Sequence, residues 1–367
     1  MQENRLRKNL DYWLIAITVL LCVFGEIILY TVTHGDKTPL YRKQIIWMAL
    51  GAAGMIVATV VDFRIYARAS RPLYIINLLL LALVLVVSHR INGASRWVRI
   101  AGFEFQPSET AKLLLTLVLA DFLVKHRDTI RTPRTLFQSL LLIGIPTLFI
   151  FKQPDLGTAL VVVAIWAGMV YMAGAKSWHL VLLFITLLGL FVLMWATGKV
   201  IKQYQKQRIE VLLGMVNNTT GAGYHVTQAR IAIGSGGFWG KGLMHASQVR
   251  GGYIPEKQTD FIFTAVGEQL GFVGAAGLLM LYALLFGRIA SIVTVPEQDP
   301  YGLLIATGIL TMIAFHVAVN IGMNVGILPV AGVPLPLVSA GGSNVLVTMY
   351  SIGLLQSIRV HRGDITF

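Results

Sequence analysis

The chain has 367 residues, of which 56% are hydrophobic and 13% charged, with a mean hydropathy of +0.71. Because soluble domains carry roughly 25% charged residues, this composition excludes a water-soluble fold and requires lipid as the main solvent. The formal net charge of +13 suits an anionic membrane surface or an anionic membrane substrate. Nucleic acid is not expected as a partner, since the basic residues are scattered over short loops. The single cysteine, Cys22, excludes a disulfide framework and a thiolate metal cluster.

Ten apolar segments are candidates for transmembrane helices, each of which needs about 20 mainly apolar residues. The basic start, Met1 to Lys8, resembles the n-region of a signal peptide. However, the apolar run after it is too long and no cleavage site follows, so it is expected to be a permanent span. The sequence therefore predicts an all-α fold, a polytopic transmembrane helical bundle in a single membrane domain covering residues 1–367. The predicted spans are 11–30, 43–61, 72–88, 108–124, 136–151, 157–174, 178–196, 260–287, 301–325 and 343–358.

Two of the connections between predicted spans differ from the other loops, one in its length and one in its content of glycine and proline. Residues 197–259 form one large loop that is rich in glycine, glutamine and basic residues. The second connection is residues 326–342, whose stretch 330–342 contains Pro334, Pro336 and three glycines at membrane depth. Lipid forbids non-helical backbone there unless protein buries it or it lines a polar cavity, so this second loop is expected to shape a site.

The charges of the short loops predict the orientation, because cytoplasmic loops carry an excess of Lys and Arg. A cytoplasmic N-terminus, followed by ten spans, places the C-terminus in the cytoplasm and residues 197–259 outside. Long loops escape the charge rule, so the basic residues of this large extracytoplasmic loop do not contradict the orientation. The residues that this topology places inside are Arg5, Arg7, Lys8, Arg64, Arg68, Arg71, Lys125, Arg127, Arg131, Arg134, Lys176, Arg288, Arg359 and Arg362.

Unusual polar residues then gather at the outer face. Glu109 and Lys112 open the predicted fourth span and, three residues apart, share one helix face. Ionisable groups inside a membrane segment indicate function by default, although a structural ion pair between helices is the alternative. Asp155 follows Lys152 in the next outer loop and suits either a site or the N-cap of the following helix.

Asp260 stands at the outer start of the predicted eighth span. It is a candidate general base because cationic neighbours surround it, and an N-cap is the alternative interpretation. Glu268 lies two turns further along and is expected to be a second cavity carboxylate or the partner of a cation. His316 is expected to be a hydrogen-bonded histidine of the bundle. The sequence contains no metal-binding motif, P-loop or dinucleotide fingerprint.

The chain resembles the SEDS family (shape, elongation, division and sporulation) from about residue 10 to 362. The motifs that carry the resemblance are Gly93–Trp97, Gln106–Lys112, Gln153–Ala159, Gln228–Gly242, Pro255–Phe263, Val319–Met323 and Gly332–Ser343. Each motif is weak alone, but the set in this order is highly specific. The chain departs from the family at Ala340, where tyrosine is usual, and at Gln258, where histidine is common. Both departures leave the acidic position unchanged.

The resemblance implies a peptidoglycan glycosyltransferase that polymerises lipid II on the outer face of the cytoplasmic membrane during elongation and rod-shape maintenance. Asp260 matches the family's essential aspartate and would act as the general base, while Lys112, Arg208 or Arg230 would hold the pyrophosphate. A divalent cation on the pyrophosphate is compatible with this chemistry, although no closed ligand set and no certain cofactor is visible. The candidate substrate-binding residues are Arg96, Trp97, Glu109, Lys112, Asp155, Arg208, Arg230 and Ser343.

The implied partners are a class B penicillin-binding protein with one membrane span and other membrane proteins of the elongation complex. Small residues favour helix packing in lipid, so Ser351 and Gly353 on the tenth span are a candidate surface for the partner's helix. A lipid II flippase and a scaffold for the penicillin-binding protein remain as alternatives. The crowding of polar residues at one face favours the enzyme over the flippase, and a scaffold does not explain Glu109 and Lys112.

Overall fold

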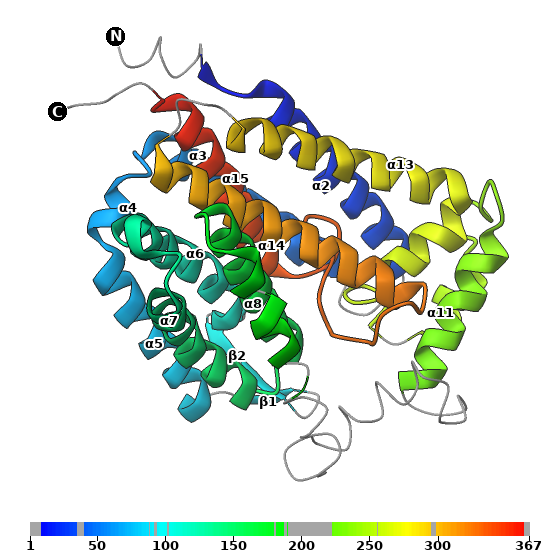
Figure 1. Cartoon of the computed structure of the whole chain (residues 1–367). Helices are drawn as coiled ribbons and strands as arrows, with labels where there is room; N and C mark the ends of the chain where they lie inside the picture. The colour runs from blue at the N-terminus through cyan, green and yellow to red at the C-terminus, as the bar shows by residue number, and fades with distance from the viewer. Residues whose placement is uncertain are drawn as a thin grey trace.

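The computed structural model describes residues 9–34, 40–87, 89–91, 94–100, 103–179, 181–186, 189, 222–254, 256–294 and 299–362. Nine helices of these residues coincide with nine of the ten predicted spans, and the seventh span begins in the helix Ser177–Thr186. Five of the helices are both long and apolar enough to cross a membrane. The all-α, polytopic fold is thus confirmed (Figure 1). The nine helices are α2 (Tyr12–Thr33), α3 (Leu40–Val60), α5 (Ser70–Val87), α6 (Pro107–Lys125), α7 (Pro133–Lys152), α8 (Leu156–Met172), α13 (Ile262–Val293), α14 (Pro300–Asn324) and α15 (Gly342–Val360).

Shorter elements connect these helices. The described part of the expected large loop contains two helices, and the connection between α5 and α6 is a three-stranded antiparallel sheet in the order β1-β2-β3. No strand was predicted there from the sequence, because segments this short do not establish an alternation of apolar and polar residues. The shorter elements are α4 (Ile65–Arg68), β1 (His89–Ile91), β2 (Ala94–Ile100), β3 (Phe103–Phe105), the 3-10 turn Arg127–Thr129, α11 (Ala222–Gly236) and α12 (Ser247–Arg250).

The surface of the tenth predicted span is buried inside the chain. Ser351 has no exposed surface, and Gly353 lies so close to Met55 and Ala58 of α3 that a side chain would not fit. The glycine lets the two helices approach closely, as small residues do in membrane bundles. Placing the partner's helix on Ser351 and Gly353 was therefore wrong, because Ser351 is buried inside the chain and α3 already packs on Gly353.

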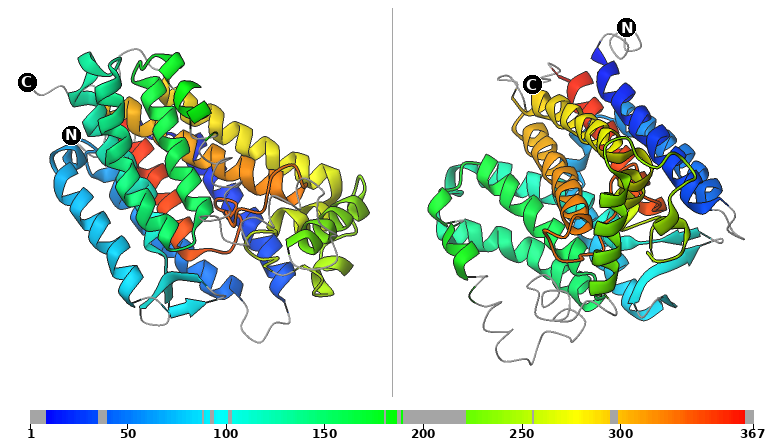
Figure 2. Two further views of the ribbon diagram at one scale, coloured as in Figure 1. Left: turned by 60° about the horizontal axis from the view of Figure 1, so that its bottom comes forward. Right: turned by 90° about the vertical axis from the view of Figure 1, so that its right-hand side faces the viewer.

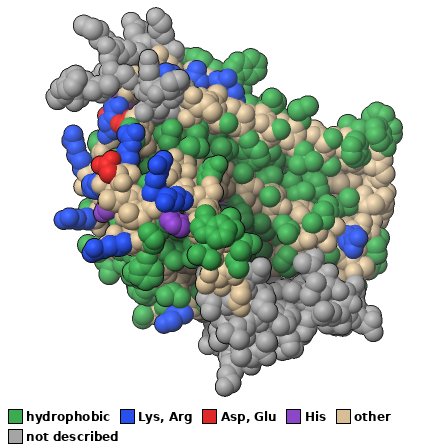
Figure 3. Space-filling view, viewed as in Figure 1, with side chains coloured by type: hydrophobic (Ala, Val, Ile, Leu, Met, Phe, Trp, Pro, Cys, Tyr) green, Lys and Arg blue, Asp and Glu red, His purple; other side chains and the backbone are tan. Residues whose placement is uncertain are grey.

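Ion pairs close one end of the bundle, which we call the predicted cytoplasmic end. It contains residues 11, 61–71, 121–134, 288–294, 299–300 and 357–362. Asp11 caps α2 and pairs with Arg288 at 2.5 Å and with Arg359. Arg64 pairs with Asp299 at 2.9 Å. The start of α2 and the end of α15 thus share one end, as an even number of spans requires (Figure 1). In Figure 3, Lys and Arg gather toward this end, near α4 and the α6–α7 connection, whereas hydrophobic side chains cover the middle of that face.

The connection between α14 and α15 is non-helical, and its residues 331–340 are largely buried. It lies at the opposite end, the predicted outer end, which contains residues 89–91, 94–100, 103–106, 153–155, 222–254, 256–261 and 326–342. Leu335, Leu337 and Val338 are almost fully buried. Tyr282 donates to the carbonyl of Pro336 at 2.5 Å, and the Gln44 side chain bonds Ser339 O and Gly341 N, both at 3.2 Å. This burial confirms the expectation of an irregular loop at membrane depth whose backbone is satisfied by protein.

Helix α13 is interrupted at Gly271, whose φ of 64° and ψ of −158° lie outside the helical region. Helix α11 packs beside this part of α13 (Figures 1 and 2). The segment that follows α11 forms hydrogen bonds with the backbone N–H and C=O groups of α13 near the break. The bonds run from Lys241 N to Glu268 O, Gly242 N to Gln269 O, Phe272 N to Gly237 O and Val273 N to Phe238 O, at 2.9–3.2 Å.

We predict that the two ends face opposite sides of the membrane, because the short loops of one end are basic. In a variant that lacks Cys22, a cysteine at Arg131 should react with an impermeant thiol reagent only in inverted vesicles. A cysteine at Tyr253, an exposed residue of the other end, should react in intact cells. Labelling of both positions from the same side would contradict the topology.

Candidate functional site

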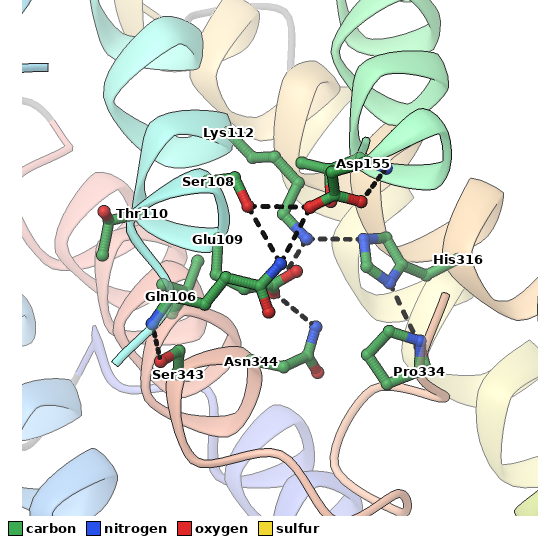
Figure 4. A network of polar contacts seen from close by, with 12 residues as sticks. Gln106, Ser108, Glu109, Thr110, Lys112, Asp155, His316, Pro334, Ser343 and Asn344 are labelled. Carbon is green, nitrogen blue, oxygen red and sulfur yellow. Dashed lines mark hydrogen bonds and ion pairs between the residues drawn. The ribbon is translucent and has the colours of Figure 1, made fainter. Parts of the chain in front are cut away.

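The centre of the polar cluster at the outer end is the ion pair of Glu109 and Lys112 (Figure 4). Lys112 Nζ lies 2.9 Å from Glu109 Oε2, and the two side chains are 1% and 5% exposed. Both belong to the first two turns of α6, where the helix N-terminus favours the carboxylate. Asn344 of α15 donates to the same oxygen of Glu109 at 2.8 Å. The pair therefore links α6 to α15.

His316 of α14 completes this ion pair. Its Nε2 lies 2.8 Å from Lys112 Nζ and its Nδ1 lies 3.1 Å from the carbonyl of Pro334. A carbonyl only accepts, so Nδ1 carries the proton and Nε2 accepts from the ammonium. The expectation of a hydrogen-bonded bundle histidine is correct, and its partner makes His316 a member of the site.

Asp155 forms a second centre beside the ion pair (Figure 4). It is the N-cap of α8, because it accepts from Thr158 N at 3.3 Å. Its Oδ2 also accepts from Gln106 Nε2 at 2.8 Å and Ser108 Oγ at 2.9 Å, while Arg96 lies 3.5 Å from Oδ1. The carboxylate is 1% exposed. Asp155 thus combines the capping role with a role in holding β2 and α6 together.

Asp260 lies just before α13. The helix begins at Ile262 with Phe261 as its N-cap residue, so the alternative interpretation of Asp260 as the N-cap was wrong. The Asp260 side chain is partly exposed. A Cβ placed on Gly332 would lie 3.5 Å from Asp260 Oδ2, and the φ of 68° at Gly332 favours glycine. The carboxylate therefore lies against the start of this loop.

The buried loop joins the two parts of the site. Its Pro334 carbonyl holds His316, and the preceding Val333 carbonyl accepts from Asn320, which also bonds the main chain of Asp260. Ala340 N donates to Gln258 O at 2.8 Å, so the two positions that depart from the SEDS pattern are connected through their backbones. A basic pair of side chains and a carboxylate are thus arranged around one rigid segment.

The other predicted site residues differ in their contacts and exposure. Arg230 of α11 is exposed and lies against Gly326, at the end of α14. Arg96 stands 5.4 Å from the ring centre of Trp97 on β2. Ser343 accepts from Gln106 N at 2.9 Å and is buried. Arg208 lies outside the described residues.

Glu268 is fully buried and belongs to the break in α13. It accepts from Lys241 Nζ at 2.8 Å, as the expectation of a cation partner required, and also from Ser247 Oγ. The amides of Gln248 and Val249 donate to its two oxygens, each at 3.0 Å. Glu268 therefore fixes the segment 241–250 and caps α12.

Sequence reasoning did not select Gln106, Ser108, Asn320, Asn324 or Asn344 as site residues. A usable signal was present, since Asn320 and Asn324 stand one turn apart inside an apolar helix, and Gln106 and Ser108 flank the selected Glu109. Lys112, His316, Pro336 and Asn344 line a cavity that has no room for a water molecule. Among the residues that the structure describes, no three His, Cys, Asp or Glu side chains are grouped as metal ligands.

A family model and individual known proteins all match nearly the whole chain. A family model described as cell cycle protein FtsW/RodA/SpoVE matches residues 11–364. The chain is 37% identical to the peptidoglycan glycosyltransferase MrdB of Escherichia coli K12, over 97% of this chain and 95% of that protein. It is 34% identical to stage V sporulation protein E of Bacillus subtilis, over 95% and 96% of the two chains.

Solved structures show the same fold. A chain of a peptidoglycan synthase complex that coordinates polymerization and crosslinking superposes with a TM-score of 0.80 and 29% identity, covering 97% of this chain and 99% of that one. The Rod shape determining protein RodA of Thermus thermophilus gives a TM-score of 0.71 and 30% identity, covering 97% and 98%.

We predict that Glu268 is an anchor for the segment 241–250. Glu268→Gln keeps one side-chain oxygen as an acceptor and replaces the other oxygen by an NH2 group. This NH2 group then faces N–H or O–H donors that it cannot accept from. Folding stability should fall by about 1–3 kcal/mol, as expected for buried groups left unpaired. Hydrogen exchange of the Gln248 and Val249 amides should accelerate in this variant, whereas Glu104→Gln on the exposed strand β3 should leave both unchanged. Unaltered exchange in Glu268→Gln would show that the segment is held by other contacts.

Proposed function

Because this chain belongs to the FtsW/RodA/SpoVE family of cell-cycle proteins, the SEDS family, we infer that it is a peptidoglycan glycosyltransferase of the membrane. The observation that carries the assignment to a site is the arrangement of Asp260 and the Lys112–His316 pair around one buried loop. Its proposed substrate is lipid II, a disaccharide-pentapeptide carried on undecaprenyl pyrophosphate. The proposed setting is the outer face of the cytoplasmic membrane, with both termini in the cytoplasm.

In the proposed reaction, Asp260 takes the proton from the acceptor hydroxyl while the new carbon–oxygen bond forms. The bond between the donor sugar and pyrophosphate breaks at the same carbon, and negative charge develops on the departing phosphate. Cationic groups at the same end stabilise this charge, and Arg96 and Arg230 are the described candidates. Lys112 was also predicted to hold the pyrophosphate, but its ammonium is buried and already bonded to Glu109 and His316. A divalent cation on the pyrophosphate stays a prediction.

The two ends of the bundle support an enzyme rather than a flippase. A flippase needs a polar path open to both sides, whereas the described cytoplasmic end is joined by the ion pairs of Asp11 and Arg64. The buried Glu109–Lys112 pair lies toward the predicted outer end and is joined through His316 to the loop that Asp260 also lies against. A scaffold alone would not require ionisable groups in a buried membrane site, since their desolvation is costly.

We propose that the enzyme works with a class B penicillin-binding protein and other elongation proteins of the membrane. The support is the similarity to a chain of a peptidoglycan synthase complex, over nearly the whole length of both chains. Since Ser351 is buried and Gly353 is covered by α3, the partner's helix must bind another part of the lipid-facing surface.

The Glu109–Lys112 pair should be needed for polymerisation. Glu109→Gln keeps an acceptor for Asn344 and Lys112 but removes the charge that balances the ammonium. We expect folded protein that forms at least tenfold less glycan polymer per molecule from purified lipid II. Glu104→Gln, which alters an exposed pair with Arg99, is the matched control. Near-normal polymer from Glu109→Gln, together with a lowered melting temperature, would instead assign the pair a structural role.

Asp260→Asn should abolish most polymerisation, because it keeps the shape of the side chain and removes its basicity. General-base catalysis contributes roughly 10²–10⁴-fold, so a loss of this size is expected in glycan chains formed from lipid II. The variant should fold, bind lipid II and retain its partner. Glu256→Gln, at an exposed carboxylate one turn earlier, should polymerise normally. Polymerisation by Asp260→Asn within a few-fold of the unmodified protein would end the general-base proposal.

A further inference from the structure

Two asparagines of α14, Asn320 and Asn324, lie one turn apart with no exposed surface. Buried amides in a membrane bundle are costly unless every polar atom finds a partner. Here the two side chains direct their groups to one short stretch of chain around Asp260 (Figure 1 shows the end of α14 beside the start of α13). The groups that these two side chains bind therefore indicate what the asparagines do.

Both asparagines donate to the main-chain carbonyl of Asp260. Asn320 Nδ2 lies 3.0 Å from this oxygen and Asn324 Nδ2 lies 2.9 Å from it. A carbonyl oxygen has two lone pairs, so these two bonds saturate it. The backbone of Asp260 is thus tied to α14, a different helix from the one it precedes.

Asn324 also caps α13. The N-cap residue Phe261 has no polar side chain, and Asn324 Oδ1 takes its place by accepting from Thr264 N at 3.2 Å and Thr264 Oγ1 at 2.6 Å. One amide group consequently fixes both the first turn of α13 and the residue before it. An N-cap from another helix makes the position of Asp260 depend on how α13 and α14 pack.

Asn320 sets the distance between Asp260 and the buried loop. Its Nδ2 donates to Val333 O at 2.8 Å in addition to Asp260 O. The neighbouring Gly332 is the residue that faces the Asp260 carboxylate. The two preceding carbonyls are held as well, since Ser339 Oγ donates to Thr259 O at 2.6 Å and Ala340 N to Gln258 O at 2.8 Å.

We propose that Asn320 and Asn324 are positioning residues that hold the Asp260 carboxylate in place for glycosyl transfer. This inference rests on the proposed function, in which Asp260 is the base. An aspartate has only two side-chain torsions, so a fixed backbone restricts its carboxylate to the few positions that the staggered rotamers allow. A displacement of about 1 Å can cost on the order of 10²-fold in rate. Neither asparagine needs to touch the substrate for this effect.

The experiment measures initial rates of lipid II polymerisation by the full chain with its transpeptidase, using Asn320→Ala and Asn324→Ala. We expect kcat per folded molecule to fall tenfold or more, while KM for lipid II stays within about threefold. Ser139→Ala is the matched control, because it removes a buried hydrogen bond of 2.9 Å from Trp166 between α7 and α8. This control should lose stability and keep its kcat.

A double variant separates positioning from a general structural role. If the asparagine acts through Asp260, adding Asn320→Ala to Asp260→Asn should lower the residual rate by no more than about twofold. A further tenfold loss, or a normal kcat in both single alanine variants, would overturn the inference. Asn320→Thr, which can retain one donor, is used if Asn320→Ala does not fold. Failure of both variants to fold would also count against it, since a structural role then suffices.

The outcomes distinguish the inference from the proposed function. If Asp260→Asn polymerises normally, the general base itself is wrongly assigned and the positioning role falls with it. If Asp260→Asn is inactive and both alanine variants keep a normal kcat, the general base stands and only the positioning role is refuted.

Discussion

Lipid offers no hydrogen bonds to a protein backbone, and this constraint determines the structure of the site. Wherever the chain leaves the helical conformation at membrane depth, another part of the protein must supply partners. The connection between α14 and α15 obtains them from Gln44, Tyr282, His316 and Asn320. A segment held by so many separate elements has little freedom to move. The same bonds that make an irregular loop tolerable in the bilayer therefore also make it a rigid support for charged side chains.

The ion pair illustrates how the same constraint acts on charges. Moving an ammonium and a carboxylate out of water is costly, and their attraction offsets that cost only with good geometry and further hydrogen bonds. Glu109 and Lys112 obtain these from Asn344 and His316, on two other helices. Because the cluster joins α6, α14 and α15, its charges are placed by the packing of the whole bundle. Such a preorganised site does not need to rearrange when charge develops on a substrate.

Much of the fold follows from the sequence, because long apolar runs and basic loops report directly on the lipid environment. The i,i+3 spacing of Glu109 and Lys112 sufficed to predict their contact, since both lie on one helix. Their contact with His316 could not be predicted, because it joins residues 204 positions apart and depends on tertiary packing. The strands β1 to β3 are too short to give an alternating pattern. The alternative interpretation of Asp260 as the cap of α13 was wrong, because a residue of another helix, Asn324, supplies the cap. Sequence position alone does not reveal a cap of this kind.

The break in α13 has a mechanical consequence. Backbone bonds on both sides of Gly271 join the helix to residues 237–242, and Glu268 adds a side-chain anchor to residues 241–250. Gly236 and Gly240 pack directly on the main chain of Gly267 and Gln269, so that backbone contacts backbone with no side chain between them. The part of α13 that precedes the break therefore behaves as one body with the end of α11. A displacement of α11 would therefore also move the residues next to Asp260 at the start of α13.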